Sequence, residues 1–164
     1  MKQLIGTTTV AFVLAALGTA HADVSEKVQK SFRGQILITD GALPGASATD
    51  AATISKYKQV KLGQLKHVSE EDGVATWHID YTAFLKKAPK VRQLSFDFYT
   101  DDKEKLFVAN KGLMGIDPLL KIVRGNLSIN EDDGVNRNRS YIIKLTGKVG
   151  KREFTFAETK LELK

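Results

Sequence analysis

The feature that most constrains the fold of this chain is a period-two alternation of apolar and polar residues. In residues 91–99, for example, Leu94, Phe96 and Phe98 alternate with polar neighbours. Similar segments, bounded by turn residues, lie at 31–39, 59–69, 74–85, 105–110, 118–130, 139–147 and 151–164. This period places the apolar side chains on one face of a strand, whereas an amphipathic helix has a period of about 3.6 residues. The pattern therefore predicts an all-β protein.

The number of strands narrows the architecture. About seven or eight short strands predict a single antiparallel β-sandwich, immunoglobulin-like in general shape. A β-barrel is the alternative, because a strand count does not distinguish one closed sheet from two packed sheets. Residues 48–59 depart from the pattern and predict a short helix. In the last strand the apolar residues change from even positions, up to Phe156, to odd positions from Leu161 onward. This change predicts a bulge near Glu158 and Thr159.

Residues 1–22 have the layout of a secretory signal peptide. Lys2 precedes an apolar run centred on residues 10–17, and the Ala-His-Ala of residues 20–22 is typical of a cleavage site. The apolar run is short for a membrane span, and no later segment is apolar enough to cross a bilayer. We therefore expect one domain at residues 23–164, exported to the periplasm or secreted.

The sequence contains no cysteine. A domain of this length can bury roughly two-thirds of the surface of its unfolded chain, so core packing can stabilise it without disulfides. Thiol chemistry and cysteine-based zinc sites are excluded, as is the usual lipid-attachment residue of bacterial lipoproteins. These properties favour a bacterial periplasmic or secreted protein.

The formal net charge is +6 at pH 7, and the basic excess is unevenly placed. Residues 137–164 contain eight basic and three acidic residues. This excess suits an anionic partner such as an envelope polymer, lipid headgroups or nucleic acid, although no motif specifies nucleic acid. Another protein is a second class of partner, and a solvated lysine-rich face is the alternative interpretation. The oligomeric state is not indicated.

Residues 67–78 (HVSEEDGVATWH) predict a hairpin. The Asp-Gly pair at 72–73 favours a two-residue type I′ turn. In the resulting register Val68 faces Trp77, and both are expected on the buried face.

The same register predicts a candidate metal site on the outer face of the hairpin. His67 faces His78, and Asp80 lies two residues farther along that face. Two histidines and one carboxylate form a known type of metal-ligand set. Surface histidines on a solvated sheet are the favoured alternative, because no second-shell partner can be named.

Three acidic turns form a second candidate site. They lie at residues 69–73, 100–105 and 130–134, which are alternate connections and are therefore expected at one end of the domain. Their candidate ligands are Glu70, Glu71, Asp72, Asp101, Asp102, Glu131, Asp132 and Asp133. Calcium takes six to eight oxygen ligands, so carboxylates from several loops could hold it. The alternative is that Asp and Asn are simply the residues that tight turns use.

The intervening connections are mainly basic and are expected at the opposite end. They lie at residues 86–92, 110–118 and 148–152. No catalytic or phosphate-binding motif occurs in the chain, and no cofactor other than calcium is suggested. We therefore expect an exported, non-enzymatic binding or structural module of the bacterial envelope or exterior. The alternative is a calcium- or other metal-dependent adhesion or carbohydrate-binding module, with a small secreted hydrolase less favoured.

Overall fold

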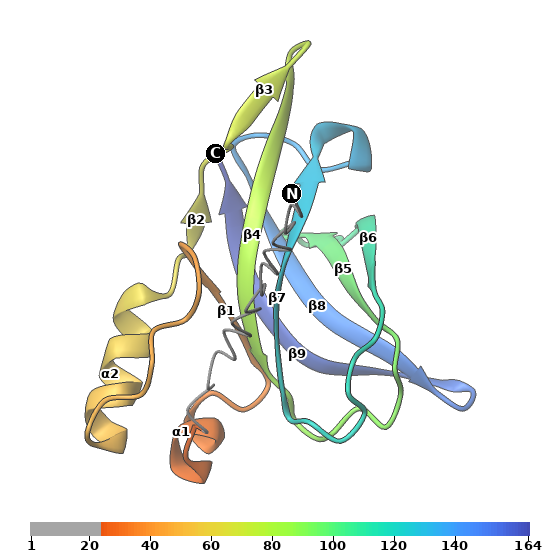
Figure 1. Ribbon diagram of the computed structural model, residues 1–164. Coiled ribbons are helices and arrows are strands. Elements are labelled where there is room, and N and C mark those ends of the chain that lie inside the picture. Colours follow the sequence, from red (N-terminus) through yellow and green to blue (C-terminus); the bar gives the residue numbers. More distant parts are fainter. Residues whose placement is uncertain (1–23) are drawn as a thin grey trace, which may run out of the picture.

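The computed structural model describes residues 24–164 (Figure 1). The elements in this part of the chain are α1 (Glu26–Ser31), β1 (Gln35–Thr39), α2 (Asp50–Val60), β2 (Gln64–Leu65), β3 (Ser69–Glu71), β4 (Val74–Phe84), β5 (Leu94–Thr100), β6 (Phe107–Leu113), β7 (Ile122–Asn130), the 3₁₀ helix η1 (Glu131–Asp133), β8 (Arg139–Val149) and β9 (Arg152–Leu163). Strands dominate, so the all-β prediction is confirmed. The predicted signal peptide and its cleavage site lie outside the described residues.

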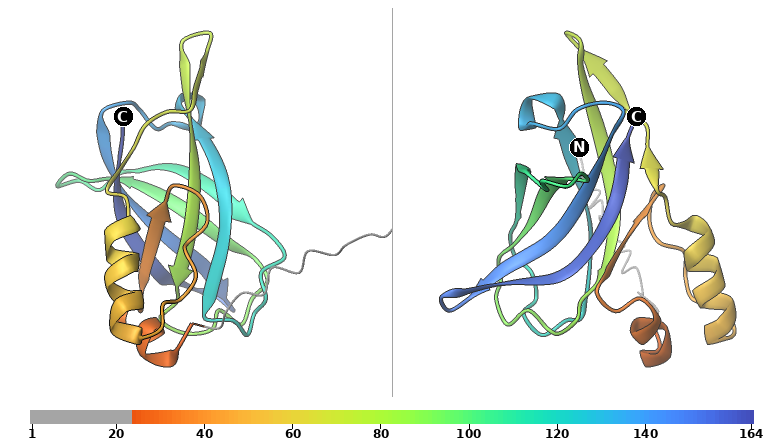
Figure 2. Two further views of the ribbon diagram at one scale, coloured as in Figure 1. Left: turned by 60° about the vertical axis from the view of Figure 1, so that its left-hand side comes forward. Right: turned by 180° about the vertical axis from the view of Figure 1, so that it is seen from behind.

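The described strands form one mixed sheet that curls into a half-barrel (Figures 1 and 2). Its strand order is β3-β4-β1-β9-β8-β5-β6, with β7 paired to β4 and β2 paired to β9. Strand β1 joins the two halves of the sheet, because it is antiparallel to β4 and parallel to β9. The predicted arrangement of two packed antiparallel sheets is not confirmed. The long, paired strands β8 and β9 instead let a single sheet curve around its own core.

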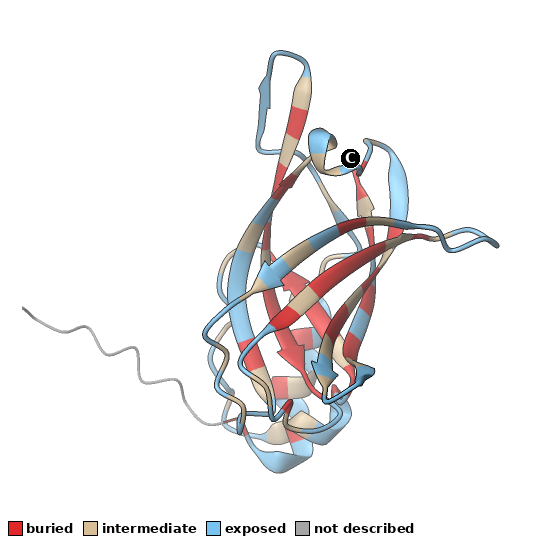
Figure 3. Ribbon diagram, turned by 90° about the vertical axis from the view of Figure 1, so that its right-hand side faces the viewer, coloured by how far each residue is buried: buried red, intermediate tan, exposed pale blue. Residues whose placement is uncertain are grey.

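The inner face of the half-barrel carries the main core (Figure 3). Alternate residues of β4 point inward, among them Trp77, Ile79 and Tyr81, which are all buried. They pack with inward residues of the opposite strands, including Phe96 and Ile143. Aromatic side chains bury large apolar areas, so this face supplies most of the hydrophobic stabilisation. The prediction that alternate apolar residues of these strands point into the core is confirmed.

The outer face of β1 carries a second, smaller core beneath the two helices. Leu37 of β1 and Phe84 of β4 point outward and pack against Phe32, which follows α1, and Tyr57 of α2. Strand β1 is therefore buried on both faces, which explains why its apolar residues are consecutive. The sequence predicts a strand from residue 31, but α1 ends at Ser31, a turn follows, and β1 begins only at Gln35.

Two further predictions concern local structure. The helix predicted at residues 48–59 is confirmed as α2, whose N-cap is Thr49. The strand predicted at 59–69 is wrong, because α2 continues to Val60 and only the short β2 and β3 follow. The bulge predicted in the last strand lies two residues earlier than expected. Its register shift falls at Phe156, which is buried beside the equally buried Ala157.

Candidate functional site

The predicted hairpin register is confirmed for residues 69–76, but the predicted pair of His67 with His78 does not form. Asp72 and Gly73 have φ values of 50° and 83°, as a type I′ turn requires, and Ser69 pairs with Thr76. Trp77 is buried as predicted, but the prediction for Val68 is wrong, because its side chain is 65% exposed. The ladder between β3 and β4 ends at Ser69, and the chain then diverges toward β9.

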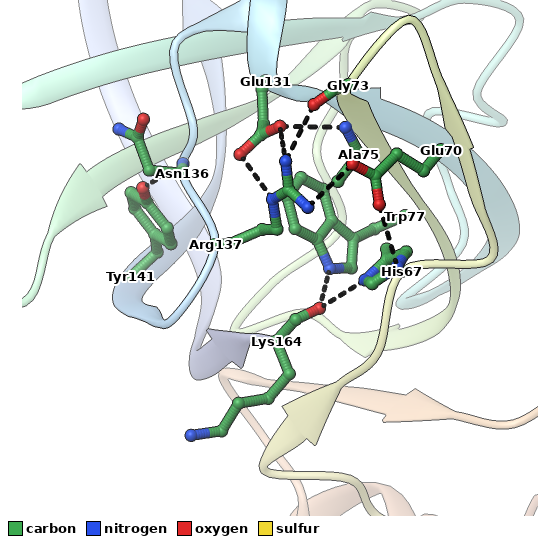
Figure 4. Close-up of polar contacts among 10 residues, drawn as sticks. All are labelled: His67, Glu70, Gly73, Ala75, Trp77, Glu131, Asn136, Arg137, Tyr141 and Lys164. Carbon is green, nitrogen blue, oxygen red and sulfur yellow. Dashed lines mark hydrogen bonds and ion pairs between the residues drawn. The ribbon is translucent and has the colours of Figure 1, made fainter.

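The two histidines of this hairpin make separate contacts, and Figure 4 shows those of His67. The backbone N–H of His67 donates to the carbonyl of Lys164 at 3.0 Å, and its ring lies 3.9 Å from the Glu70 carboxylate. The ring of His78 lies 3.3 Å from the Ser128 hydroxyl and 3.7 Å from the Asp80 carboxylate. His78 and Asp80 therefore lie together on the outer face, whereas His67 belongs to the junction with β9.

The three acidic turns lie at the same end of the half-barrel. Strand β4 begins there, while β7 and β5, which run in the opposite direction, end there. Arg137 is the centre of this end (Figure 4): it donates to both carboxylate oxygens of Glu131 at 3.1 and 3.2 Å, and to Glu70 at 3.1 Å. It also donates to the carbonyl of Gly73 at 2.8 Å. The arginine thereby ties the β3–β4 hairpin to η1.

Other carboxylates of these turns are also paired with cations. The ion pairs join Asp133 to Lys111 at 2.7 Å, Asp101 to Lys160 at 2.9 Å, and Asp102 to Arg139 at 3.4 Å. Glu71, Asp72 and Asp132 are exposed to solvent. In residues 24–164, no group of three or more His, Asp or Glu side chains is placed to hold a metal ion. The structure thus brings the predicted ligands to one end but ties most of them to basic side chains.

A calcium site at the acidic end stays a prediction, and thermal unfolding tests it. A bound ion would raise the melting temperature in millimolar calcium, and EDTA would reverse the increase. The same melting experiment with zinc in place of calcium tests the predicted metal site of His67, His78 and Asp80. A melting temperature that does not respond to either metal contradicts both metal predictions.

The acidic end should make stability depend on pH. Hydrogen bonds from the Ala75 N–H and from Arg137 hold the pKa of Glu131 below its usual value of 4.5. Because this folded-state pKa is lowered, the contribution to stability is complete above the unfolded-state pKa and is lost as pH falls through the lowered value. We expect the midpoint of urea unfolding to fall between about pH 6 and about pH 3, and to fall less in Arg137→Gln. The exposed Arg152→Gln serves as the control, and an unchanged pH dependence in Arg137→Gln would contradict this role.

The opposite end of the half-barrel is built from two connections that lie side by side. Residues 85–93 follow β4, and residues 114–121 precede β7. Backbone N–H groups of Leu85 and Lys90 donate to the carbonyls of Lys121 and Pro118 at 2.8 and 2.9 Å. In the opposite direction, the backbone N–H of Ile116 donates to the carbonyl of Arg92 at 3.1 Å. We call these two connections, together with the β8–β9 turn at the same end, the basic end.

Three large apolar side chains project from the basic end into solvent. Leu119 is 78% exposed, Met114 76% and Leu120 54%. All three lie in the connection between β6 and β7, which the backbone hydrogen bonds above hold in place. Isolated exposed leucines are ordinary, but three large apolar side chains on one connection make it a candidate interaction surface.

Exposed cations lie on the same two connections as these apolar side chains and at the β8–β9 turn. They are Lys86, Lys87, Lys90, Arg92 and Lys121 on the two connections, and Lys148, Lys151 and Arg152 at the β8–β9 turn. A pocket of about 170 Å³ beside Lys121 is lined by three further basic residues, Lys30, Arg33 and Lys86, and by Glu26, which is paired with Lys30 at 3.0 Å. The basic end thus combines positive charge, a small cationic pocket and exposed apolar side chains.

Comparisons with protein-family models, with curated proteins and with solved structures each gave no match. Among the described helices, none is long and apolar enough to span a membrane. Arguments about function therefore depend on the residues and the geometry given above.

Proposed function

We propose that this protein is an exported, non-enzymatic binding module that attaches to anionic phospholipid of the bacterial envelope through its basic end. The observation that carries the proposal is the exposure of Met114, Leu119 and Leu120 at an end of the half-barrel whose connections also expose several lysines and arginines. Export is supported by the signal-peptide layout of residues 1–22. A binding role without catalysis is supported by a sequence that carries no catalytic motif.

The apolar side chains favour lipid over the other anionic partners. A wall polymer or a nucleic acid needs only positive charge at the interface, and leucines exposed to it would remain in water. At a membrane, the same leucines can enter the boundary between headgroups and acyl chains while the lysines stay with the phosphates. The cationic pocket beside Lys121 supports the proposal, because its basic lining suits a headgroup phosphate.

The expected attachment is reversible. A basic residue near an anionic membrane surface contributes about 1 kcal/mol, and each buried leucine contributes up to about 1.5–3 kcal/mol. Neither contribution approaches the insertion energy of a membrane-spanning helix. We therefore expect a peripheral protein that anionic lipid retains on the membrane and that salt releases in part.

Sedimentation with lipid vesicles tests the proposal. The protein should sediment with vesicles that contain phosphatidylglycerol and remain in the supernatant with pure phosphatidylcholine. High salt should weaken the binding without abolishing it, because the apolar contribution is not screened. Failure to bind phosphatidylglycerol vesicles at low salt would contradict the proposal. Binding to an anionic wall polymer but not to vesicles would instead support the polymer.

Fractionation of cells that produce the full-length chain tests export separately. The protein should be recovered outside the cytoplasm and lack the first 22 residues by mass spectrometry. Recovery of the uncleaved chain in the cytoplasm would contradict export without bearing on vesicle binding.

A further inference from the structure

A groove of about 420 Å³ lies on the outer face of the sheet, away from the basic end's connections. Its floor is formed by Asp80 and Thr82 of β4 and by Asn126 and Arg124 of β7, which pair with them across the ladder. Tyr57 of α2 forms one wall. The volume lies within the range of about 300–1,000 Å³ that is typical of small-molecule sites.

The connection between β1 and α2 forms the other wall of the groove. Figure 2 shows this connection beside β1 and β4, and residues 41–46 line the groove. Its start is fixed by the Gly41 N–H, which donates to Asp80 at 3.2 Å, and by the Thr39 hydroxyl, which donates to the Gly41 carbonyl at 2.7 Å. Its end is fixed by the Ser47 N–H, which donates to the Thr53 hydroxyl at 2.9 Å. The wall is therefore held by hydrogen bonds at both ends.

Two buried residues that line the groove carry hydroxyl groups. Tyr57 and Thr82 are each only 2% exposed, and no hydrogen bond joins either hydroxyl to another residue of the described chain. Neither oxygen is sealed from solvent, so both remain able to bind a molecule in the groove. Burial raises the pKa of Tyr57, and the nearby positive charge of Arg124 opposes this effect. The Tyr57 hydroxyl therefore stays protonated at neutral pH and can donate a hydrogen bond.

The lining of the groove includes donor groups that suit an oxyanion. The guanidinium of Arg124 forms no ion pair with any residue of the described chain, and it borders the groove together with the Asn126 amide. Arginine binds carboxylate and phosphate through two parallel hydrogen bonds, which a hydroxyl or amide donor can supplement. Asp80 is an acceptor in the same groove and suits a hydroxyl of the ligand. Leu43 and Pro44 add an apolar border.

We infer that this groove binds a small organic anion that carries a carboxylate or phosphate group together with hydroxyl groups. Arg124, Tyr57 and Asn126 bind the oxyanion, and Asp80 accepts a hydrogen bond from a hydroxyl of the ligand. This inference does not rest on attachment to lipid, because the lining of the groove shares no residue with the basic end.

Chemical-shift mapping by NMR tests the inference with defined probes. Gluconate supplies the carboxylate, glycerol 3-phosphate supplies the phosphate, and glycerol and inorganic phosphate are the controls. We expect millimolar gluconate or glycerol 3-phosphate to shift the amide signals of Arg124, Asn126 and residues 41–46, and the stronger of the two identifies the anionic group. Binding of inorganic phosphate alone would indicate an adventitious ion only and overturn the inference, as would equal binding of glycerol.

Variants distinguish binding in the groove from binding elsewhere. Arg124→Gln should weaken the affinity about tenfold or more, because it removes a charged hydrogen-bond donor. Tyr57→Phe should weaken it roughly threefold, because it removes one neutral donor. Lys58→Gln, which removes an exposed charge from the same helix as Tyr57, should leave the affinity unchanged. Equal affinity of the wild type and a folded Arg124→Gln variant, or no response to either anion, would overturn the inference.

Discussion

Replacement of Leu119 and Leu120 by glutamine should lower partition onto phosphatidylglycerol vesicles by about tenfold or more, since each factor of ten corresponds to about 1.4 kcal/mol. Both side chains are already exposed in the free protein, so their replacement removes no core contact and should leave the melting temperature nearly unchanged. The loss should be equally large at high salt, where the apolar contribution dominates the binding. Vesicle sedimentation and thermal unfolding measure the two effects independently.

The structure offers a matched control for this variant. Val68 and Leu106 are 65% and 53% exposed, and both lie toward the acidic end. Glutamine at these two positions removes a similar exposed apolar surface, yet binding to vesicles should not change. Equal losses for the two double variants would contradict docking through the basic end and would indicate nonspecific adsorption.

A charge variant separates the electrostatic part of the attachment. Arg92→Glu with Lys121→Glu should weaken vesicle binding at low salt, and the difference from the wild type should shrink as salt rises. Lys58→Glu with Lys103→Glu changes the net charge by the same amount at exposed positions away from the basic end. Binding that depends only on net charge would affect both variants equally, which would contradict a defined docking surface.

The sequence predicts the inner faces of the strands well, because burial on one face leaves a period-two pattern. It fails where both faces are buried or where pairing is short. Leu37 lies on the outer face of β1, where only α1 and α2 can cover it, and α1 is too short to show a helical period. Val68 follows the correct register but lies beyond the last paired residue, so its expected burial does not occur.

The architecture could not be derived from the strand pattern. One curled sheet and two packed sheets both give alternating strands separated by turns, and the deciding feature is the junction at β1. The parallel pair between Gln35 and Glu158 joins segments more than a hundred residues apart, and no local sequence pattern predicts such a pair. Gly125 illustrates the same limit, because it pairs in regular register with Tyr81, whose hydroxyl occupies the space that a Cβ would need.

The candidate sites likewise divide into those that the sequence shows and those that only the folded chain brings together. Acidic turns and paired histidines are conspicuous in a sequence, and the structure connects most of those carboxylates to cations. The sequence pattern places Leu119 and Leu120 in a strand at 118–130, but β7 begins only at Ile122, after the turn at Asp117 and Pro118. The groove combines Tyr57 and Arg124 from distant segments, so only the folded chain brings them together.

Replacement of Gly134 by alanine should strongly destabilise the fold. Gly134 ends η1 with a φ of 105°, and its N–H donates to the carbonyl of Glu131. A Cβ at this position would lie 2.5 Å from the carbonyl oxygen of Val108, a backbone atom of β6 that cannot turn aside. The left-handed conformation costs about 1–3 kcal/mol, and the forced displacement adds about 1–3 kcal/mol. Urea unfolding at neutral pH measures the loss.

Gly73→Ala is the control that isolates the steric part of this effect. Gly73 has a φ of 83°, also in the left-handed region, but the space that its Cβ would occupy is open. It should lose only the conformational part, about 1–2 kcal/mol. The difference between the two variants measures how firmly η1 is packed against β6, and therefore how rigidly the chain presents Arg137 to Glu70 and Glu131. Equal destabilisation by the two substitutions would show that this contact yields and that the acidic end is not held by packing.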